Sequence, residues 1–257
     1  MGMDLLKVKD KALSFMKPAR REVLKWFREQ YKIELKPDSS PVTIADRNAE
    51  EILRKKLAKH YPEHGIIGEE FGNYNAQAEW VWTIDPVDGT RSFIRGLPLF
   101  ASMLALLHKG EPVLGIIDLP ALGETAWAVK GEGAFLNGKP LKVSRQKKLK
   151  GAFIVVADWY CFKQEKRIAL FNKLNKEASI VRTYPDAFGH LMAIRGTVDV
   201  MVDPLAKIWD YAPCKILVQE AGGKFANFSG NRASIEEGTA IVGNKNLVKE
   251  VRKIISQ

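Results

Sequence analysis

Apolar residues recur at helical spacing in the first quarter of the chain and predict two helices there. Residues 4–31 predict the first, and Ile44 to His60 predicts the second. The polar stretch Lys36 to Pro41 contains two prolines, so it reads as the loop that joins them. The apolar positions that carry these predictions are Leu13, Met16, Val23, Phe27 and Tyr31 in the first helix, and Ala49, Ile52, Leu53 and Leu57 in the second.

Strand-like segments follow, at 80–85, 99–108, 112–118 and 124–129, and a turn-rich stretch then runs to Val143. Glycines separate these segments at short intervals, as in antiparallel hairpins. The remainder alternates between strands and helices, which predicts layered α and β elements. The strands are expected at 153–157, 179–184, 198–202, 225–228 and 240–242, and the helices at 164–176, 187–195, 209–221 and 246–255.

Near 145–152 the predicted pattern changes from hairpin strands to alternating strands and helices, and this bears on domain organisation. We expect 1–257 to be a single catalytic unit, with two lobes as a further possibility. The lobe at 1–150 would be a metal-binding lobe built mainly on an antiparallel sheet. The lobe at 151–257 would alternate α and β elements and supply Asp210.

The composition describes a globular protein with an excess of positive charge. Of its 257 residues 46% are hydrophobic, and the formal net charge is +10. The densest basic stretch, Lys139 to Lys150, has no interleaved aromatic residues, which favours a solvated lysine face over a nucleic-acid surface. Nucleic acid is therefore a disfavoured partner, although the charge permits it. A positive field would also draw small anionic substrates towards a cleft.

No apolar run approaches the length of a membrane span, and the N-terminus lacks the apolar region of a signal peptide. Cys161 and Cys214 are too few and too far apart for a disulfide framework or a zinc site. These features predict a soluble protein of a reducing cytoplasm that has no membrane partner.

The most informative segment is Asp85-Pro86-Val87-Asp88-Gly89-Thr90, which follows the apolar run Trp80 to Ile84. A turn of type I would also use Pro and Asp, but two acids, a Gly and a Thr directly after a buried strand favour a site. Three other acids are ambiguous alone. Asp46 fits a helix capping box with Thr43, Glu69 fits a solvated strand end, and Asp210 fits a helix start.

Together these acids suggest metal chemistry. Glu69, Asp85, Asp88 and Asp210 come from distant positions and would form an all-oxygen ligand set, which favours Mg²⁺ or Mn²⁺ over Zn²⁺. Gly89 and Thr90 before a short helix would make a seat for a phosphate. A divalent metal cluster beside a phosphate seat indicates phosphoryl chemistry.

The chain resembles the inositol monophosphatase family over almost its whole length. The resemblance is carried, in order, by Gly68-Glu69-Glu70, by Asp85-Pro86-Val87-Asp88-Gly89-Thr90, and by Trp209-Asp210-Tyr211-Ala212 with Glu220-Ala221-Gly222-Gly223. It implies a five-layer αβαβα sandwich. It also implies a homodimeric, lithium-sensitive phosphomonoesterase that uses two or three Mg²⁺ ions, with Mn²⁺ as a substitute.

The resemblance also assigns roles to residues. Glu69, Asp85, Asp88, Asp210 and the carbonyl of Val87 would hold the metal ions, and the backbone amides of Gly89 and Thr90 would hold the phosphate. Glu69, Thr90 and Asp46 would be the catalytic residues that orient the attacking, metal-activated water, so Asp46 would do more than cap a helix. The expected substrate-binding residues are Asp88, Gly89, Thr90, Arg91, Asp186, Asp203 and Lys207.

Three segments look like the histidinol-phosphate phosphatase branch of the family: Ser39 to Arg47, His64 to Gly72 and Asp88 to Ile94. Trp209 instead follows the general family. The substrate is thus expected to be histidinol phosphate or inositol monophosphate, and Asp203 or Asp186 would face the amine of the former. The alternatives are a fructose-1,6-bisphosphatase, a 3'(2'),5'-bisphosphate nucleotidase, and a non-enzymatic relative that binds RNA or the transcription machinery.

Overall fold

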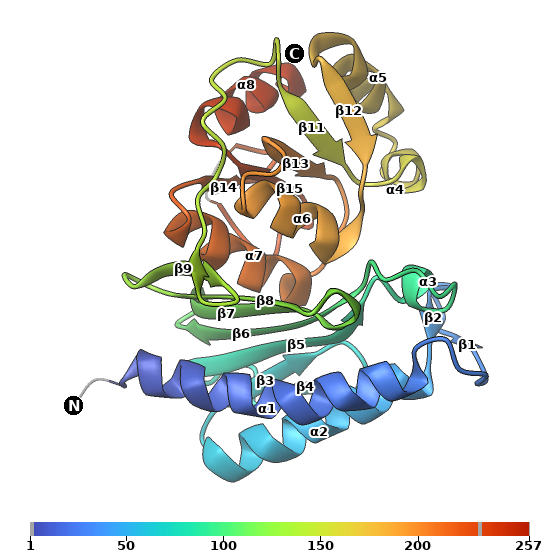
Figure 1. The fold of residues 1–257 in the computed structure, drawn as a ribbon, viewed down its shortest axis with the longest axis vertical. Helices are drawn as coiled ribbons and strands as arrows, with labels where there is room; N and C mark the ends of the chain where they lie inside the picture. The colour runs from blue at the N-terminus through green and yellow to red at the C-terminus, as the bar shows by residue number, and fades with distance from the viewer. Residues whose placement is uncertain (1–2, 231–232, 257) are drawn as a thin grey trace.

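Two long helices form one outer layer of the molecule. The computed structural model describes residues 3–230 and 233–256, and in it α1 (Leu5–Trp26) lies beside α2 (Ile44–His60) below the larger sheet (Figure 1). The bounds of α2 are those predicted from its apolar spacing. Its start is fixed by a capping box, in which the Thr43 side chain accepts from the Ala45 amide and Asp46 accepts from the Thr43 amide.

The larger sheet has eight strands in the order β10-β9-β8-β7-β6-β5-β3-β4, and every neighbouring pair is antiparallel except β3 and β5. The hairpins predicted from the glycine spacing are therefore present. The strands are β3 (Gly65–Gly68), β4 (Gly72–Tyr74), β5 (Trp80–Asp88), β6 (Ala101–His108), β7 (Glu111–Leu119), β8 (Glu124–Val129), β9 (Gly133–Leu136) and β10 (Lys139–Pro140).

The smaller sheet has five strands in the order β12-β11-β13-β15-β14, with β11 parallel to both of its neighbours and β15 antiparallel to both of its own. A separate pair, β1 (Glu34–Leu35) and β2 (Pro41–Val42), flanks the loop after α1. The strands of the smaller sheet are β11 (Phe153–Val156), β12 (Ile180–Thr183), β13 (Val200–Asp203), β14 (Lys224–Ala226) and β15 (Ala240–Gly243).

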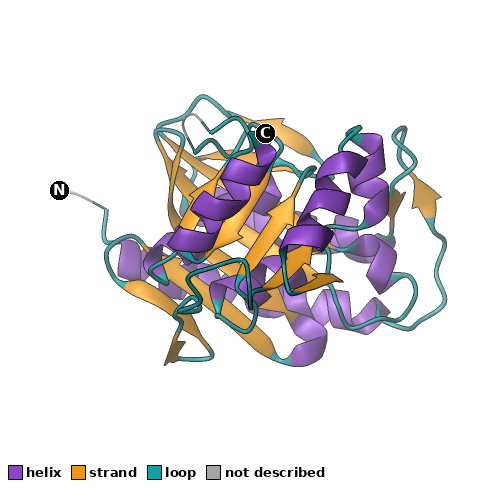
Figure 2. Cartoon of the chain, turned by 90° about the horizontal axis from the view of Figure 1, so that it is seen from above, coloured by secondary structure: helices purple, strands orange, loops and turns teal. Residues whose placement is uncertain are grey.

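Helices fill the space between the sheets and cover the smaller one. The middle layer consists of α6 (Asp186–Ile194) and α7 (Ile208–Glu220), and α5 (Ile168–Glu177) and α8 (Lys245–Ile255) cover the far face (Figure 1). Seen from above, helices lie across the strands of the smaller sheet (Figure 2). The predicted αβαβα layering is confirmed. Two short helices, α3 (Thr90–Phe93) and the 3₁₀ turn η1 (Pro120–Leu122), complete the larger half.

The helix predicted at 164–176 corresponds to α5, which begins four residues later, and the short helix that precedes it was not predicted. α4 (Trp159–Gln164) begins at Asp158, whose Oδ1 accepts from the Cys161 amide at 2.8 Å, and α5 follows after a break. Lys166 at the break has a φ of 55°, a left-handed conformation that ends the first helix. Apolar spacing does not reveal such a break.

The core is divided by the larger sheet. One cluster of buried apolar side chains lies between this sheet and α1 with α2, and a larger cluster surrounds α6, α7 and the smaller sheet. Because α7 packs against strands of both sheets, it joins the two halves. The division of the chain into two lobes stays a prediction. Among the described helices, none is both long and apolar enough to cross a membrane.

Candidate functional site

The site is built around an irregularity at the end of β5. Asp85 pairs with Met103 and Asp88 with Ala101, so β5 has one residue more than its neighbour β6 between these pairs. Residues three apart on a regular strand face opposite ways, and a bulge of one residue cancels that alternation. The Ser102 hydroxyl donates to the Pro86 carbonyl at 2.7 Å, and the Val87 amide donates to Asp85 at 3.0 Å. The bulge thereby turns both carboxylates towards one space.

A third carboxylate reaches this space from the other half of the molecule. Asp210 lies in the first turn of α7, where its Oδ2 accepts from the Lys207 amide at 2.7 Å. Oxygens of Asp85, Asp88 and Asp210 lie within 4.8 Å of one another. No other group of three potential ligand residues meets this criterion among the residues that the structure describes. The three acids therefore form one carboxylate cluster that spans both halves.

The pKa values of these acids are raised because burial removes water from carboxylates that also repel one another. For Asp85 and Asp88 burial is the larger cause, followed by the charges of neighbouring acids, and both pKa values lie well above the ordinary value. Burial and the charge of Glu69 raise the pKa of Asp210 to about 7. A cluster of this kind needs a cation to be ionised near neutral pH.

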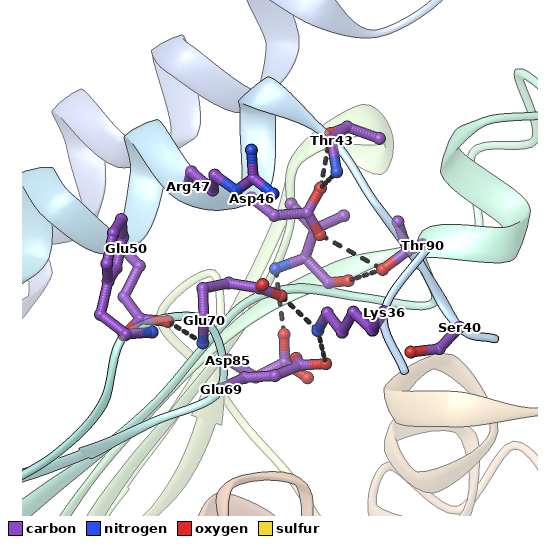
Figure 3. Close-up of polar contacts among 12 residues, drawn as sticks. Lys36, Ser40, Thr43, Asp46, Arg47, Glu50, Glu69, Glu70, Asp85 and Thr90 are labelled. Carbon is purple, nitrogen blue, oxygen red and sulfur yellow. Dashed lines mark hydrogen bonds and ion pairs between the residues drawn. The ribbon is translucent and has the colours of Figure 1, made fainter. Parts of the chain in front are cut away.

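Glu69 and Glu70 lie next to the cluster and are held by Lys36 (Figure 3). Lys36 Nζ is 2.7 Å from Glu69 Oε1 and 2.6 Å from Glu70 Oε1. Burial alone would lower the pKa of Lys36, but the two carboxylates raise it. The buried Glu50 accepts from the amide of Glu70 at 2.8 Å and so fixes this corner after β3.

Asp46 lies at the centre of a hydrogen-bonded chain that reaches the bulge. One oxygen accepts from the backbone of Thr43, as the capping box requires, and the other accepts from the Thr90 hydroxyl at 3.2 Å (Figure 3). The Thr90 hydroxyl is also 2.9 Å from the Val87 carbonyl. Burial raises the pKa of Asp46 to about 6, against the hydrogen bonds from Thr43 that lower it. The residue thus both caps α2 and faces the site.

Gly89 and α3 follow the bulge directly. Gly89 has a φ of 80°, and a Cβ there would lie 3.0 Å from the Leu99 carbonyl oxygen and 3.1 Å from Asp186 Oδ2. The turn therefore requires glycine. It leads directly into α3, and the first amides of a helix have no partner within that helix. Gly89 and Thr90 both line the cleft that opens here.

A cleft of about 490 Å³ opens above this turn. Its lining includes Glu69, Gly89, Thr90 and Arg91 from the first half of the chain and Asp158, Tyr160 and Asp186 from the second half. Burial and the charges of Asp203 and Asp158 raise the pKa of Asp186 to about 7, and Arg91 opposes them. The cleft joins Glu69 and the Gly89 turn to acids from the second half of the chain, and Asp186 also lines a small adjoining cavity with Asp88 and Asp210.

Two predicted substrate-binding residues have other surroundings. Asp203 is 4% exposed, and its carboxylate accepts from the Leu205 amide at 3.1 Å and faces His190 Nε2 at 3.0 Å. It lines a small cavity of about 70 Å³ next to Asp88 and Asp186. Lys207 lines a neighbouring hollow, and its backbone amide donates to Asp210.

Sequence reasoning missed Lys36 and Asp158. Lys36 is one lysine among many in a polar loop, so nothing in its neighbourhood marks it. Asp158 had one signal, since an Asp before a short aromatic segment is a typical helix cap, but that gives no hint of a cleft.

Comparisons with known proteins agree with this geometry. Residues 5–256 match the model of the inositol monophosphatase family. The histidinol-phosphatase of Chlorobaculum parvum is 37% identical over 236 residues, which cover 91% of each chain, and that of Mycobacterium tuberculosis is 36% identical over 86% of each. The solved inositol monophosphatase of Thermotoga maritima superposes with a TM-score of 0.87 at 30% identity, covering 99% of this chain and 97% of its own.

Proposed function

We propose that this chain, which belongs to the inositol monophosphatase family, is a phosphomonoesterase that uses Mg²⁺ to hydrolyse histidinol phosphate. Its membership and its histidinol-phosphatase relatives make it a phosphoric monoester hydrolase. The metal and the substrate are the parts that we add. The convergence of Asp85, Asp88 and Asp210 within 4.8 Å is the observation that carries the proposal.

The donor set fits a hard divalent cation. All three side chains offer oxygen only, and burial together with the charges of neighbouring acids raises their pKa values. We infer that Asp85, Asp88 and Asp210 hold the metal, with Glu69 and the Val87 carbonyl as further ligands. Bound there, Mg²⁺ would neutralise phosphate oxygens and lower the pKa of a water molecule. Mn²⁺ has similar ligand preferences and is expected to substitute.

The protein groups around the cluster support this reaction. The amides at Gly89 and Thr90 would bind the phosphate and fix its orientation, a role supported by the position of both residues in the lining of the cleft beside Glu69. Asp46 would accept the hydrogen bond of the Thr90 hydroxyl, which leaves a Thr90 lone pair to orient the attacking water. Glu69 would take up the proton that this water loses. Lys36 would keep the Glu69 carboxylate in place through its ion pair.

The choice of histidinol phosphate rests on two supports. Three relatives named histidinol-phosphatase are 35–37% identical to this chain over most of its length. The part of the cleft lining that comes from the second half of the chain is acidic, with Asp158 and Asp186, and would attract a leaving alcohol that carries an amine. A polyol such as inositol can donate hydrogen bonds to these carboxylates but gains no ion pair from them.

Phosphate release from four substrates tests the proposal: L-histidinol phosphate, inositol 1-phosphate, fructose 1,6-bisphosphate and adenosine 3',5'-bisphosphate. Each is measured with Mg²⁺ and with a chelator. We expect histidinol phosphate to give the highest kcat/KM, and both the chelator and Asp88→Asn to abolish turnover. Asp10→Asn, an exposed acid on α1, is the matched control. Activity that persists without divalent metal, or a preference for another substrate, would contradict the proposal.

A further inference from the structure

Glu50 is a buried acid on α2 that the proposed reaction does not use. It has no exposed surface, and both of its carboxylate oxygens accept hydrogen bonds. Its Oε2 accepts from the amide of Glu70 at 2.8 Å (Figure 3), and its Oε1 accepts from the amide of Phe71 at 3.2 Å. Because hydrogen bonds to an ionised carboxylate are strong, two successive amides bound in this way fix the backbone of the turn after β3.

Arg54 adds a second set of contacts to the same turn. Its Nε donates to Glu50 Oε1 at 2.7 Å, its Nη2 donates to the Gly72 carbonyl, and its guanidinium lies over the Phe71 ring, 6.0 Å from the centroid. A buried ion pair adds little net stability to a fold, because the cost of removing both groups from water offsets their attraction. The pair is therefore better explained by the geometry that it imposes on the turn.

This turn carries Glu69. The Glu69 amide donates to the Ile84 carbonyl at 3.2 Å, directly before Asp85 in β5, so its backbone is fixed between β5 and the neighbouring contacts with Glu50. Glu69 is not one of the three acids within 4.8 Å of one another, yet its charge contributes to the raised pKa of all three. A small movement of this backbone would therefore decide whether the Glu69 carboxylate can join the carboxylate cluster around a cation.

We propose that Glu50 and Arg54 are positioning residues for the metal site, because they fix the turn from which Glu69 reaches a cation held by the carboxylate cluster. This role rests on the proposed function, which makes Glu69 a metal ligand. Lys36 contacts the end of the Glu69 side chain, whereas Glu50 holds the backbone from which that side chain starts. Asp46 lies four residues before Glu50, so successive turns of α2 would position two parts of the site.

Two variants test this role through Mg²⁺ binding to the substrate-free protein, measured by isothermal titration calorimetry. Glu50→Gln should raise the Kd for Mg²⁺ about tenfold or more, because one acceptor oxygen becomes an NH₂ donor that faces a backbone amide. Arg54→Lys keeps a positive charge beside Glu50 but loses the planar group that reaches the Gly72 carbonyl, so it should raise the Kd about threefold. In both variants, hydrogen–deuterium exchange of the amides at 69–72 should become faster.

Glu124→Gln is the matched control, because Glu124 also pairs with an arginine, Arg195, at 2.9 Å, and its strand β8 is separated from β3 by three strands. It should leave both the Kd and the exchange at 69–72 unchanged. A Glu50→Gln protein that melts at a lower temperature but binds Mg²⁺ with the wild-type Kd would overturn the proposal, as would an equal rise in Kd in the control. If Glu50→Gln does not fold, a wild-type Kd in Arg54→Lys overturns it. A wild type that binds no Mg²⁺ would instead refute the proposed function.

Discussion

Binding of Mg²⁺ should stabilise this protein against heat, and more strongly at pH 8 than at pH 6. The cluster oxygens lie within 4.8 Å of one another, so two ionised acids repel each other by about 3.5 kcal/mol or more at an effective dielectric constant of about 20. Ionising all three acids at once would raise the free energy of the folded, metal-free protein. The raised pKa of each acid reflects this repulsion together with burial. A bound cation removes the repulsion.

The sign of the pH dependence follows from the direction of these shifts. A carboxyl whose folded pKa is raised stabilises the fold below its unfolded pKa, and that contribution is lost as the pH rises through the folded pKa. For Asp210 the folded pKa is about 7, so the metal-free protein should become less stable between about pH 5 and 8. Asp46 and Asp186, with pKa values of about 6 and about 7, act in the same direction.

Metal binding opposes this trend because it requires ionised ligands. At a Mg²⁺ concentration about 100 times Kd, stabilisation at pH 8 is about 2.7 kcal/mol. For a chain of this size that corresponds to a rise in Tm of about 5–10 °C. At pH 6 a proton competes at Asp210, which weakens binding about tenfold and should roughly halve the rise.

Differential scanning calorimetry at both pH values, with Mg²⁺ and with a chelator at matched ionic strength, measures these effects. Asp85→Asn provides a variant in which the cluster has one charge less. Its metal-free form should melt higher than the wild type at pH 8, and Mg²⁺ should shift its Tm less. A metal-free Tm that does not change from pH 5 to 8, or an equal Mg²⁺ shift at both values, would refute the electrostatic reasoning.

Three further variants test separate parts of the molecule. Asp46→Asn should lower kcat about 100-fold with little change in KM, because it disturbs the orientation of the attacking water and not phosphate binding; steady-state kinetics would contradict this if only KM changed. Gly89→Ala should lower activity more than tenfold in the same assay, because its φ of 80° disfavours a side chain and the Cβ would crowd a carbonyl; wild-type rates would disprove it. Arg20→Ala should cost about 3 kcal/mol in urea unfolding, because it leaves the buried Asp118 without its ion pair at 3.1 Å, whereas a similar loss in the exposed control Arg21→Ala would remove that explanation.

The sequence was most informative where a local rule and a functional demand coincide. The bounds of α2 follow from apolar spacing and a capping box, both of which are local. The Asp85 and Asp88 pair stood out because two acids, a glycine and a threonine follow a buried strand directly, a combination that favours a site over a simple turn. Whether Asp210 would approach them depends on how α7 packs between two sheets, and no local pattern contains that information.

The remaining elements of the cleft depend on long-range contacts. Lys36 gains its role only because its loop folds back over Glu69 and Glu70, more than thirty residues away. The break at Lys166 depends on a backbone conformation that many residues tolerate poorly but that lysine adopts here. The sequence favoured Asp203 as a substrate-binding residue, but in the structure its carboxylate faces His190 on a neighbouring helix.

The extra residue in β5 makes the backbone path from Asp85 to Asp88 as important as the identity of its residues. If these four residues paired regularly with β6, Asp88 would turn to the other side of the sheet, among apolar side chains. Loss of the bulge with all four residues kept would therefore separate the two acids. Related proteins should tolerate substitution at Pro86 and Val87 more readily than any change that straightens β5 at this point.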